Sequence, residues 1–357
     1  WTIVILTNII GSGCVWVNFP CLFFSCDYCT KSELSFDQMD DADMESYWRH
    51  WLDKEEAALA REEDHKDDSK TVVTFDLQQI LPIPKLKSTK QSFYRTRMHC
   101  YNLCFYVKNK KQGYCYMWSQ VEGGRGSNEI ATCLRRFVDE HLTDSRHIVF
   151  YSDGCPGQNK KSAVVVVLAH MAHNSQPGQV IDLKFFATGH SHMEVDSVHA
   201  AIERASHGVE IGTPGDWIQL FQSAKKTGDQ PYICEELDRS LFVDWKEVAR
   251  AAFKTNALEG ISAMHWISAR NVEGKLTLLW GEGVLGPLYP IEWRSAGGQF
   301  GWNFLPRAYQ GRLKLPKKKY DDSAAMVPLL RNKTNAQLYF RDVRELVSEA
   351  APQQGPR

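Results

Sequence analysis

Two stretches decide the fold: residues 71–77, TVVTFDL, and residues 146–159, RHIVFYSDGCPGQN. Each begins as a run of apolar and β-branched residues, which is typical of a buried strand. Each also carries an aspartate, Asp76 inside the first run and Asp153 directly after the second. If the two strands pair in parallel in one sheet, their aspartates will approach one another at its centre.

The sequence around these runs alternates between strand-like and helix-like patterns. Residues 161–173 are interpreted as a helix because a connection between parallel strands normally needs one, although the valines at 164–167 favour a strand. The predicted elements are strands at 71–77, 92–107 and 114–120, a helix at 127–142, a strand at 146–152, a helix at 161–173, a strand at 180–188 and a helix at 191–206.

This order predicts an α/β fold of the ribonuclease-H-like kind, in which five strands form one mixed sheet with flanking helices. Beyond residue 212 the pattern is looser and predicts a smaller, mixed α+β region. Its expected elements are helices at 217–226 and 245–253 and short strands at 264–270, 275–280 and 288–293.

Changes in composition mark the organisation of the chain. From Lys31 to Lys70, fourteen acidic residues stand against six lysines and arginines, and apolar positions at helical spacing predict an acidic helix with one packed stripe. Between residues 307 and 344, ten basic residues outnumber three acidic ones. The predicted parts are an apolar segment at 1–25, a zinc knuckle and acidic helix at 26–70, the core at 71–212 and the C-terminal region at 213–357.

Residues 1–25 contain no charged residue and are long enough for a membrane span or the apolar part of a secretory signal. No basic segment precedes them, and polar or turn-forming residues such as Thr7, Asn8, Gly11 and Pro20 interrupt the run. A membrane anchor is therefore not expected. Because the chain opens with tryptophan rather than methionine, we interpret this segment as a sign of a fragment or of a misjoined gene model.

The whole-chain composition narrows the classes of function. The 357 residues are 43% hydrophobic, which suits a globular fold with a sizeable core. The 42 lysines and arginines against 43 acidic residues leave a net charge of -1, so an anionic partner must meet a local basic patch. Ten cysteines in a chain of this length do not make a disulfide scaffold and indicate a reducing compartment.

Three aspartates are candidate catalytic residues and metal ligands: Asp76, Asp153 and Asp196, the last early in the helix after the fifth strand. Such a cluster suits two Mg²⁺ or Mn²⁺ ions about 3.5 to 4 Å apart, because hard cations take oxygen ligands and clamp the oxygens of a phosphodiester displacement. Asp76 is the strongest of the three candidates, because an unpaired carboxylate inside an apolar strand is costly. Aspartate is also common at strand ends and helix starts, for turn and capping reasons.

The loop after the fourth predicted strand offers further polar groups. Gln158 and Asn159 are candidates for holding metal-bound water or a backbone phosphate, and Lys160 and Lys161 for supplying a countercharge. Cys155 is an alternative nucleophile, but no histidine or acid stands at the spacing of a known cysteine enzyme.

The helix that carries Asp196 holds residues that compete with it or support it. Glu194 competes as a metal ligand, although Ser191 and Glu194 together fit the capping box of a helix N-terminus. His199 and Glu203 fall on the same helical face as Asp196, and one or the other is expected to support the ligands. His190 is expected to orient a carboxylate or a phosphate.

Cysteines and histidines suggest zinc at two other places. Cys26 and Cys29 form a Cys-x-x-Cys knuckle that can supply two zinc ligands, with His50 as a third and His65 as a candidate for the fourth. The spacing from Cys29 to His50 is longer than in a common zinc finger. The pair His190 and His192 is loosely similar to the motif of metallo-β-lactamase-type zinc hydrolases, whose last two positions do not match here.

Several short motifs together resemble a known family. The chain resembles the uncharacterised transposon-derived proteins of animals that carry a ribonuclease-H-like domain of unknown function, and the resemblance covers roughly residues 26–346. The motifs are residues 75–79 (FDLQQ), 93–94 (FY), 101–103 (YNL), Trp118, 126–130 (GSNEI), 151–159 (YSDGCPGQN), 189–196 (GHSHMEVD) and 315–320 (LPKKKY).

The resemblance implies an ancestor of the acid-triad transposase or integrase type, with Asp76, Asp153 and Asp196 in the metal-binding places. It also implies a Cys/His zinc element upstream, at the knuckle described above. The chain departs from the family pattern before Cys26 and near Pro328, where the usual helix after the basic run is altered. These departures concern mobilising activity more than the fold.

The sequence thus predicts a transposon-derived nuclease or strand-transfer enzyme that acts on DNA phosphodiesters with Mg²⁺ or Mn²⁺. The first two aspartates would bridge two ions and the third would complete one site. Lys317, Lys318 and Lys319 in the basic segment would contact DNA phosphates. The protein is expected to be nuclear and to need no small-molecule cofactor. Whether it forms a homo-oligomer is left open. The main alternative is a domesticated DNA- or chromatin-binding protein that keeps the fold without cutting; a zinc hydrolase is a third hypothesis.

Overall fold

The structure is a computed structural model that describes residues 26–87, 90, 92–154, 159–187, 189–226, 228, 230–254, 256–292 and 301–348. The chain forms two compact units, residues 1–49 and residues 50–357. The apolar segment at 1–25 lies outside the described residues. Within them, no helix combines the length and the apolar character that crossing a bilayer requires.

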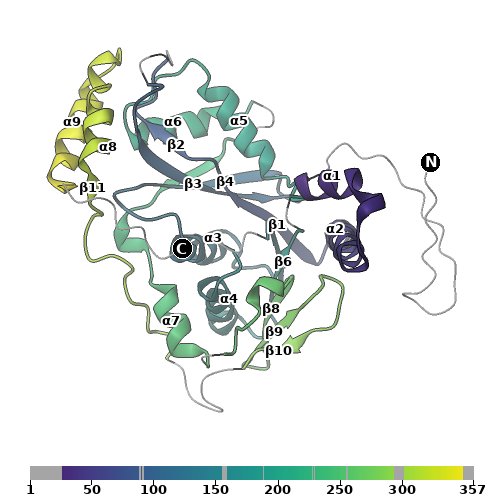
Figure 1. Ribbon diagram of the computed structural model, residues 1–357. Helices are drawn as coiled ribbons and strands as arrows, with labels where there is room; N and C mark the ends of the chain where they lie inside the picture. Colours follow the sequence, from purple (N-terminus) through teal and green to yellow (C-terminus); the bar gives the residue numbers. More distant parts are fainter. Residues whose placement is uncertain are drawn as a thin grey trace, which may run out of the picture. The chain divides into compact units, whose positions relative to one another are not determined.

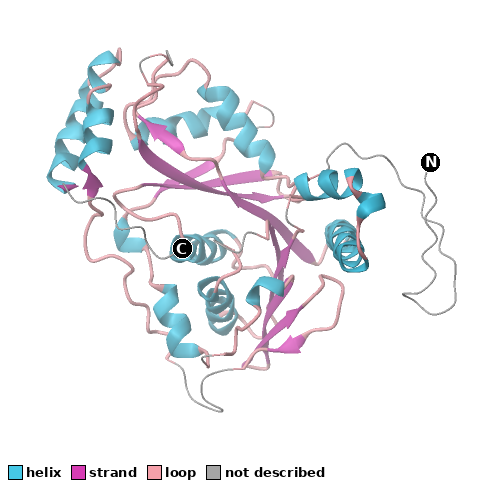
Figure 2. Ribbon diagram, in the orientation of Figure 1, coloured by secondary structure: helices cyan, strands magenta, loops and turns pink. Residues whose placement is uncertain are grey.

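In the first unit, α1 (Asp27–Leu34) precedes a short 3₁₀ helix and the start of α2 (Asp41–Lys66), which is the acidic helix predicted from the sequence (Figures 1 and 2). The Cys26 side chain accepts a hydrogen bond from the Cys29 N–H (3.4 Å) and thereby caps α1. The Phe36 ring packs edge-on against Tyr47 and Trp48.

The second unit is built on one mixed sheet, which has ten strands in the described part of the chain. Their order across the sheet is β10-β9-β8-β6-β5-β1-β3-β4-β7, and β2 pairs with β3. The strands are β1 (Lys70–Leu77), β2 (Leu81–Ile83), β3 (Met98–Val107), β4 (Gln112–Ser119), β5 (His147–Ser152), β6 (Val180–Phe185), β7 (Ile233–Glu236), β8 (Trp266–Val272), β9 (Lys275–Gly281) and β10 (Tyr289–Pro290).

The five strands predicted for the core lie side by side in the middle of this sheet. β1, β3 and β4 form an antiparallel meander, while β5 and β6 continue parallel to β1 on its other side, as predicted. The prediction that the sheet has only five strands is wrong. The C-terminal region adds β7 to the edge at β4 and β8 to the edge at β6, and so covers backbone that would otherwise be unpaired.

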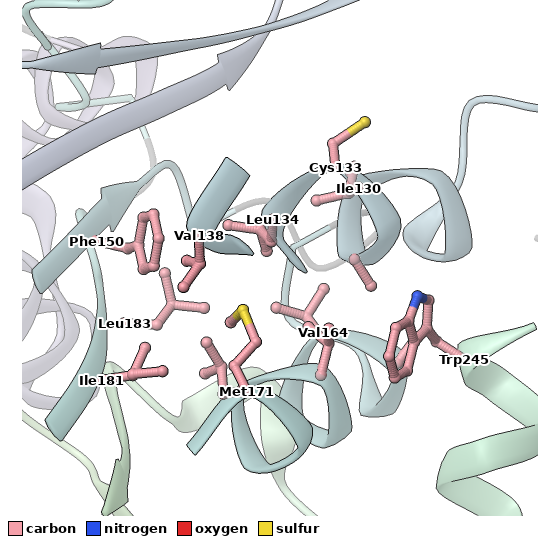
Figure 3. Close-up of a cluster of buried hydrophobic side chains, with 14 of the residues drawn as sticks. Ile130, Cys133, Leu134, Val138, Phe150, Val164, Met171, Ile181, Leu183 and Trp245 are labelled. Carbon is pink, nitrogen blue, oxygen red and sulfur yellow. The ribbon is translucent and has the colours of Figure 1, made fainter. Parts of the chain in front are cut away.

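Helices cover both faces of the sheet (Figure 1). On one face, α3 (Ser127–His141), α4 (Ser162–Asn174) and α7 (Trp245–Ala252) pack on the odd-numbered residues of β1 and β3, and on the other lie α5 (Asp196–Ser206) and α6 (Pro214–Ala224). The segment with four consecutive valines is helical, as predicted, because every side of α4 is buried. Figure 3 shows part of this core, with Ile130, Cys133, Leu134 and Val138 of α3, Val164 and Met171 of α4, Phe150, Ile181 and Leu183 of the sheet, and Trp245 of α7.

The basic segment near the C-terminus is partly helical. Lys317 to Lys319 form the first turn of α8 (Lys317–Ala324), and a 3₁₀ turn that contains Pro328 leads on to α9 (Thr334–Val343). A short parallel pair, β11 (Leu315–Pro316) and β12 (Val347–Ser348), closes this part of the chain. Of the strand predicted at 288–293, only Tyr289–Pro290 is extended as β10, and residue 293 lies outside the described residues.

Candidate metal centre

The pairing of β1 with β5 sets two of the three predicted aspartates opposite one another. The register matches Thr74 with Tyr151, so the same register two residues further on brings Asp76 to Asp153. Side chains alternate along a strand, which puts Asp76 on the same face as Thr74, the face that α5 and α6 cover. The prediction that β1 and β5 are neighbours is therefore confirmed.

The third aspartate reaches this place because the start of α5 is tied to β1. The Val195 N–H donates a hydrogen bond to the Thr74 hydroxyl (3.2 Å), and the Met193 N–H donates to the Asp196 carboxylate (2.8 Å). Both bonds satisfy backbone groups ahead of the helix. They hold the first turn of α5 above the strand that carries Asp76.

Asp76, Asp196 and His199 converge. Each offers one ligand atom, and these three atoms lie within 4.8 Å of one another. The Nε2 atom of His199 is buried and has no hydrogen-bond partner in the described part of the chain. An unsatisfied buried nitrogen beside two carboxylates is costly unless a cation is shared between them. Two carboxylates and an imidazole form a donor set that suits a divalent cation.

Burial disfavours the charged forms of both Asp76 and His199. Burial raises the pKa of Asp76 to about 6, and the negative charges of Asp153 and Asp196 add to this effect. Burial lowers the pKa of His199, although the two neighbouring carboxylates Asp76 and Asp196 oppose the shift. A bound cation would stabilise the ionised carboxylates and the neutral imidazole at the same time.

Asp153 approaches Asp76 but is not one of the three residues whose ligand atoms share the 4.8 Å group. Its carboxylate accepts a short hydrogen bond from the Asn159 side chain, which also donates to the Ser152 hydroxyl (2.8 Å). Asn159 is 3% exposed. Asn159 thus contacts Asp153, and its predicted role in holding metal-bound water or a phosphate stays a prediction. Gln158 and Cys155 lie outside the described residues.

We expect Asn159→Ala to lower the free energy of unfolding by about 1–3 kcal/mol, because it removes the buried amide that donates hydrogen bonds to the Ser152 hydroxyl and the Asp153 carboxylate. Urea unfolding measures the change. Asn332→Ala, at an exposed asparagine, is the matched control and should change stability by less than about 0.5 kcal/mol. Equal effects of the two variants would contradict the proposed restraint on Asp153.

The prediction that Lys160 contacts a phosphate is wrong. Its side chain is buried, and its Nζ atom donates to the Ser262 carbonyl (2.9 Å) and lies over the Phe185 ring. Burial lowers the pKa of Lys160 to about 8. Lys161, at the N-terminus of α4, is partly exposed, so its predicted phosphate contact stays a prediction.

The two histidines of the zinc-hydrolase hypothesis turn to different partners. The Nε2 atoms of His190 and His50 lie 3.1 Å apart, whereas the exposed His192 has its Nδ1 atom 3.6 Å from the Asp196 carboxylate. A shared zinc site of His190 and His192 is therefore not formed, and His190 lies beside His50 rather than in the group of Asp76. The zinc ion expected at the knuckle and His50 stays a prediction.

The capping box predicted at Ser191 and Glu194 is wrong, because α5 begins only at Asp196. Instead, Glu194 faces cations: its carboxylate lies 3.8 Å from the guanidinium of Arg61 and 4.0 Å from the ammonium of Lys108. Glu194 thus forms ion pairs with Arg61 and Lys108. It does not belong to the group of Asp76, Asp196 and His199 that could hold a metal.

Two buried acids were missed by the sequence prediction. Asp182 interrupts the apolar run of β6 as Asp76 interrupts that of β1, and its carboxylate accepts bonds from His147 (2.7 Å) and the Trp266 indole (3.0 Å). Asp64 of α2 is 3% exposed and pairs with Lys184 (2.7 Å). An acid in an apolar strand therefore signals a special environment, and only the structure separates an internally satisfied acid from an unsatisfied one.

The three lysines predicted to contact DNA differ in their surroundings. Lys317 is exposed and pairs with Asp321 (2.8 Å), and Lys318 is exposed. Lys319 is partly buried, and its Nζ atom lies 3.1 Å from the Nδ1 atom of His99.

These features define a mixed α/β protein with a carboxylate–imidazole cluster at the centre of its sheet. The model of the domain of unknown function DUF7869 matches residues 90–278, which is more than half of the chain, and the chain belongs to this family. The match includes Asp153, Asp196 and His199 and begins after Asp76. No curated protein and no solved structure matches the chain.

Proposed function

We propose that this protein is a transposon-derived nuclease or strand-transfer enzyme that acts on DNA phosphodiester bonds with a divalent cation. The observation that carries the proposal is the convergence of Asp76, Asp196 and His199 beside Asp153. Within the described residues, neither Asp76 nor Asp196 forms an ion pair with a lysine or an arginine, whereas Asp64 pairs with lysines. A carboxylate with a perturbed pKa inside such a cluster, here Asp76, is a candidate for catalysis.

The strand order supports a ribonuclease-H-like ancestry. The central five strands run in the order β4-β3-β1-β5-β6, with β4 to β1 antiparallel and β5 and β6 parallel to β1. This is the arrangement expected of a ribonuclease-H-like core, in which acids on the first and fourth strands meet. The strand order bears only on the ancestry of the protein. The proposed chemistry is inferred from the side chains of the cluster.

The residues present fit a divalent cation. Asp76 and Asp196 would supply oxygen ligands and His199 a nitrogen ligand, which favours Mn²⁺ over Mg²⁺ because imidazole suits the softer ion better. When bound, such an ion would stabilise negative charge on the reacting phosphate oxygens. Asn159 donates a hydrogen bond to the Asp153 carboxylate, whose charge helps to raise the pKa of Asp76.

Cleavage or joining of labelled DNA by the purified chain, treated with chelator and then supplied with Mn²⁺ or Mg²⁺, tests this function. We expect strand cleavage or joining that depends on the metal, and a loss of about 100-fold or more in Asp76→Asn and Asp196→Asn. Asp144→Asn, at an exposed aspartate, is the matched control and should keep full activity. An inactive wild type, or an active Asp76→Asn, would overturn the proposal.

One observation favours the alternative, a DNA- or chromatin-binding protein that no longer cuts. Asp153 stays outside the 4.8 Å group, so the third carboxylate of an acid triad does not share the site in this conformation. In that case DNA binding would depend on salt, would not need metal, and would be unchanged in Asp153→Asn. Both candidates place the protein on nuclear DNA.

A further inference from the structure

At the beginning of β3 lies a group of cations that form no ion pair with an acid in the described part of the chain. Arg97 and His99 stand two residues apart and therefore on the same side of the chain as it enters the strand. Lys319, from the first turn of α8, brings its Nζ atom to within 3.1 Å of the Nδ1 atom of His99. A third segment is the turn after β4, which carries Arg125.

A series of contacts connects the turn that carries Arg125 with His99. The Trp118 indole donates a hydrogen bond to the Gly124 carbonyl (2.8 Å) and so fixes the turn that carries Arg125. The Trp118 ring lies 5.9 Å from the Tyr101 ring, and the Tyr101 ring lies 6.3 Å from that of His99. The glycine-rich turn is thereby held at the same end of the sheet as His99.

The electrostatics at His99 agree with this grouping. Burial, followed by the charges of Lys319, Arg97 and Arg125, lowers the pKa of His99 to about 4. Burial also lowers the pKa of Lys319, to about 8. His99 is therefore neutral at pH 7, and the positive charge of the group comes from the other three residues.

Acids near these cations are bound elsewhere. Within the described ranges, no carboxylate lies within 4 Å of Arg97, Arg125 or Lys319. Asp322, three residues after Lys319, accepts the Thr96 N–H (3.1 Å). Arg97 and Lys319 are partly buried and Arg125 is exposed. Clustered cations without an anion are costly, and phosphate is the usual ligand that offsets such a group.

Two exposed aromatic residues precede Arg97 by only a few positions in the chain. Phe93 and Tyr94 are 76% and 90% exposed, and their rings pack edge to face with 4.9 Å between centroids. They lie in the loop that leads directly into Arg97. Large exposed aromatics beside unpaired cations are the combination that binds single-stranded nucleic acid, in which bases stack on rings and cations hold phosphates.

We propose that Arg97, Arg125 and Lys319 form a phosphate site for single-stranded DNA, whose unpaired bases stack on Phe93 and Tyr94. The choice of DNA rests on the proposed function, and the site is separate from the metal cluster. Asp76 pairs with Cys104, which is five residues along β3 from His99, roughly 17 Å away. The odd and even residues of the strand also point to opposite faces, so the two sites lie on different faces of the sheet.

Fluorescence anisotropy of a labelled 15-nucleotide thymidine strand with the full chain in EDTA tests the site without cleavage. Removal of one cation, in Arg97→Gln, Arg125→Gln or Lys319→Gln, should weaken binding and reduce the slope of log K against log salt by about 0.7. Tyr94→Ala should weaken binding by about five- to 150-fold and leave that slope unchanged, because stacking involves no counterion release.

Lys275→Gln, at an exposed lysine at the opposite edge of the sheet, is the control and should bind as the wild type does. Wild-type binding by both Arg97→Gln and Tyr94→Ala would overturn the site. Competition by inorganic phosphate or thymidine monophosphate as effective as that by the strand would instead indicate a site for free phosphate and overturn the DNA assignment. Intact binding in a chain that never cleaves DNA would contradict the proposed catalysis and leave this site standing.

Discussion

Asp76→Asn is expected to make the metal-free chain more stable at pH 7.5, although it removes the central residue of the proposed site. The folded protein raises the pKa of Asp76 from 3.8 to about 6, first through burial and then through the charges of Asp153 and Asp196. This difference corresponds to about 3 kcal/mol of destabilisation once the carboxylate is ionised. A neutral amide of the same shape avoids that cost.

The sign of the pH dependence follows from the raised pKa. The contribution of Asp76 to stability is fully present below its unfolded pKa of 3.8 and is lost as the pH rises through about 6. The advantage of Asp76→Asn over the wild type should therefore shrink as the pH falls from 7.5 toward 4. Chemical unfolding of both proteins in EDTA, at several pH values, measures the difference.

Added Mn²⁺ should reverse the ranking of the two proteins. An ion that binds only the folded state stabilises it in proportion to ligand concentration, and the wild type has the full donor set of Asp76, Asp196 and His199. Asp144→Asn should behave as the wild type in both conditions. Equal stability of wild type and Asp76→Asn in EDTA at pH 7.5 would contradict the account of an uncompensated cluster.

The order of the central elements could be predicted because each carries a strong local pattern. The valine and aromatic runs of β1 and β5 and the helical spacing of α3 identify their elements without tertiary information. The short strands β7 and β10 have four and two residues and carry almost no periodicity. Their membership of the sheet depends on pairing with distant strands, so the full extent of the sheet could not be predicted.

The candidate site was predictable where topology decides it and not where side-chain surroundings decide it. Strand order was enough to bring Asp76 toward Asp153, but not to show that His199 offers an unsatisfied nitrogen. Lys160 looks like a phosphate contact in the sequence because it follows a glycine-rich loop. Only the structure shows that the Lys160 side chain is buried and that its ammonium donates a hydrogen bond to the Ser262 carbonyl.

Asp64→Ala is expected to be among the most destabilising single substitutions in the second unit. The Asp64 carboxylate accepts hydrogen bonds from Lys184 (2.7 Å), Lys70 (2.9 Å) and the Tyr151 hydroxyl (2.6 Å). These bonds hold the pKa of Asp64 below its ordinary value although burial, the largest influence, raises it. Asp64 and Lys184 are 120 residues apart in the sequence, so no local pattern indicates their pairing.

The expected cost of Asp64→Ala is about 3–5 kcal/mol, because Lys184, which is 5% exposed, would keep a buried charge without a partner. Urea unfolding measures it, with Glu63→Ala at the neighbouring exposed position as the control, expected within about 0.5 kcal/mol of the wild type. Asp64→Ala combined with Lys184→Met should recover much of the loss, since no unpaired charge then remains in that place. A double variant no more stable than Asp64→Ala alone would show that the cost comes from lost packing between α2 and the sheet rather than from the orphaned ammonium.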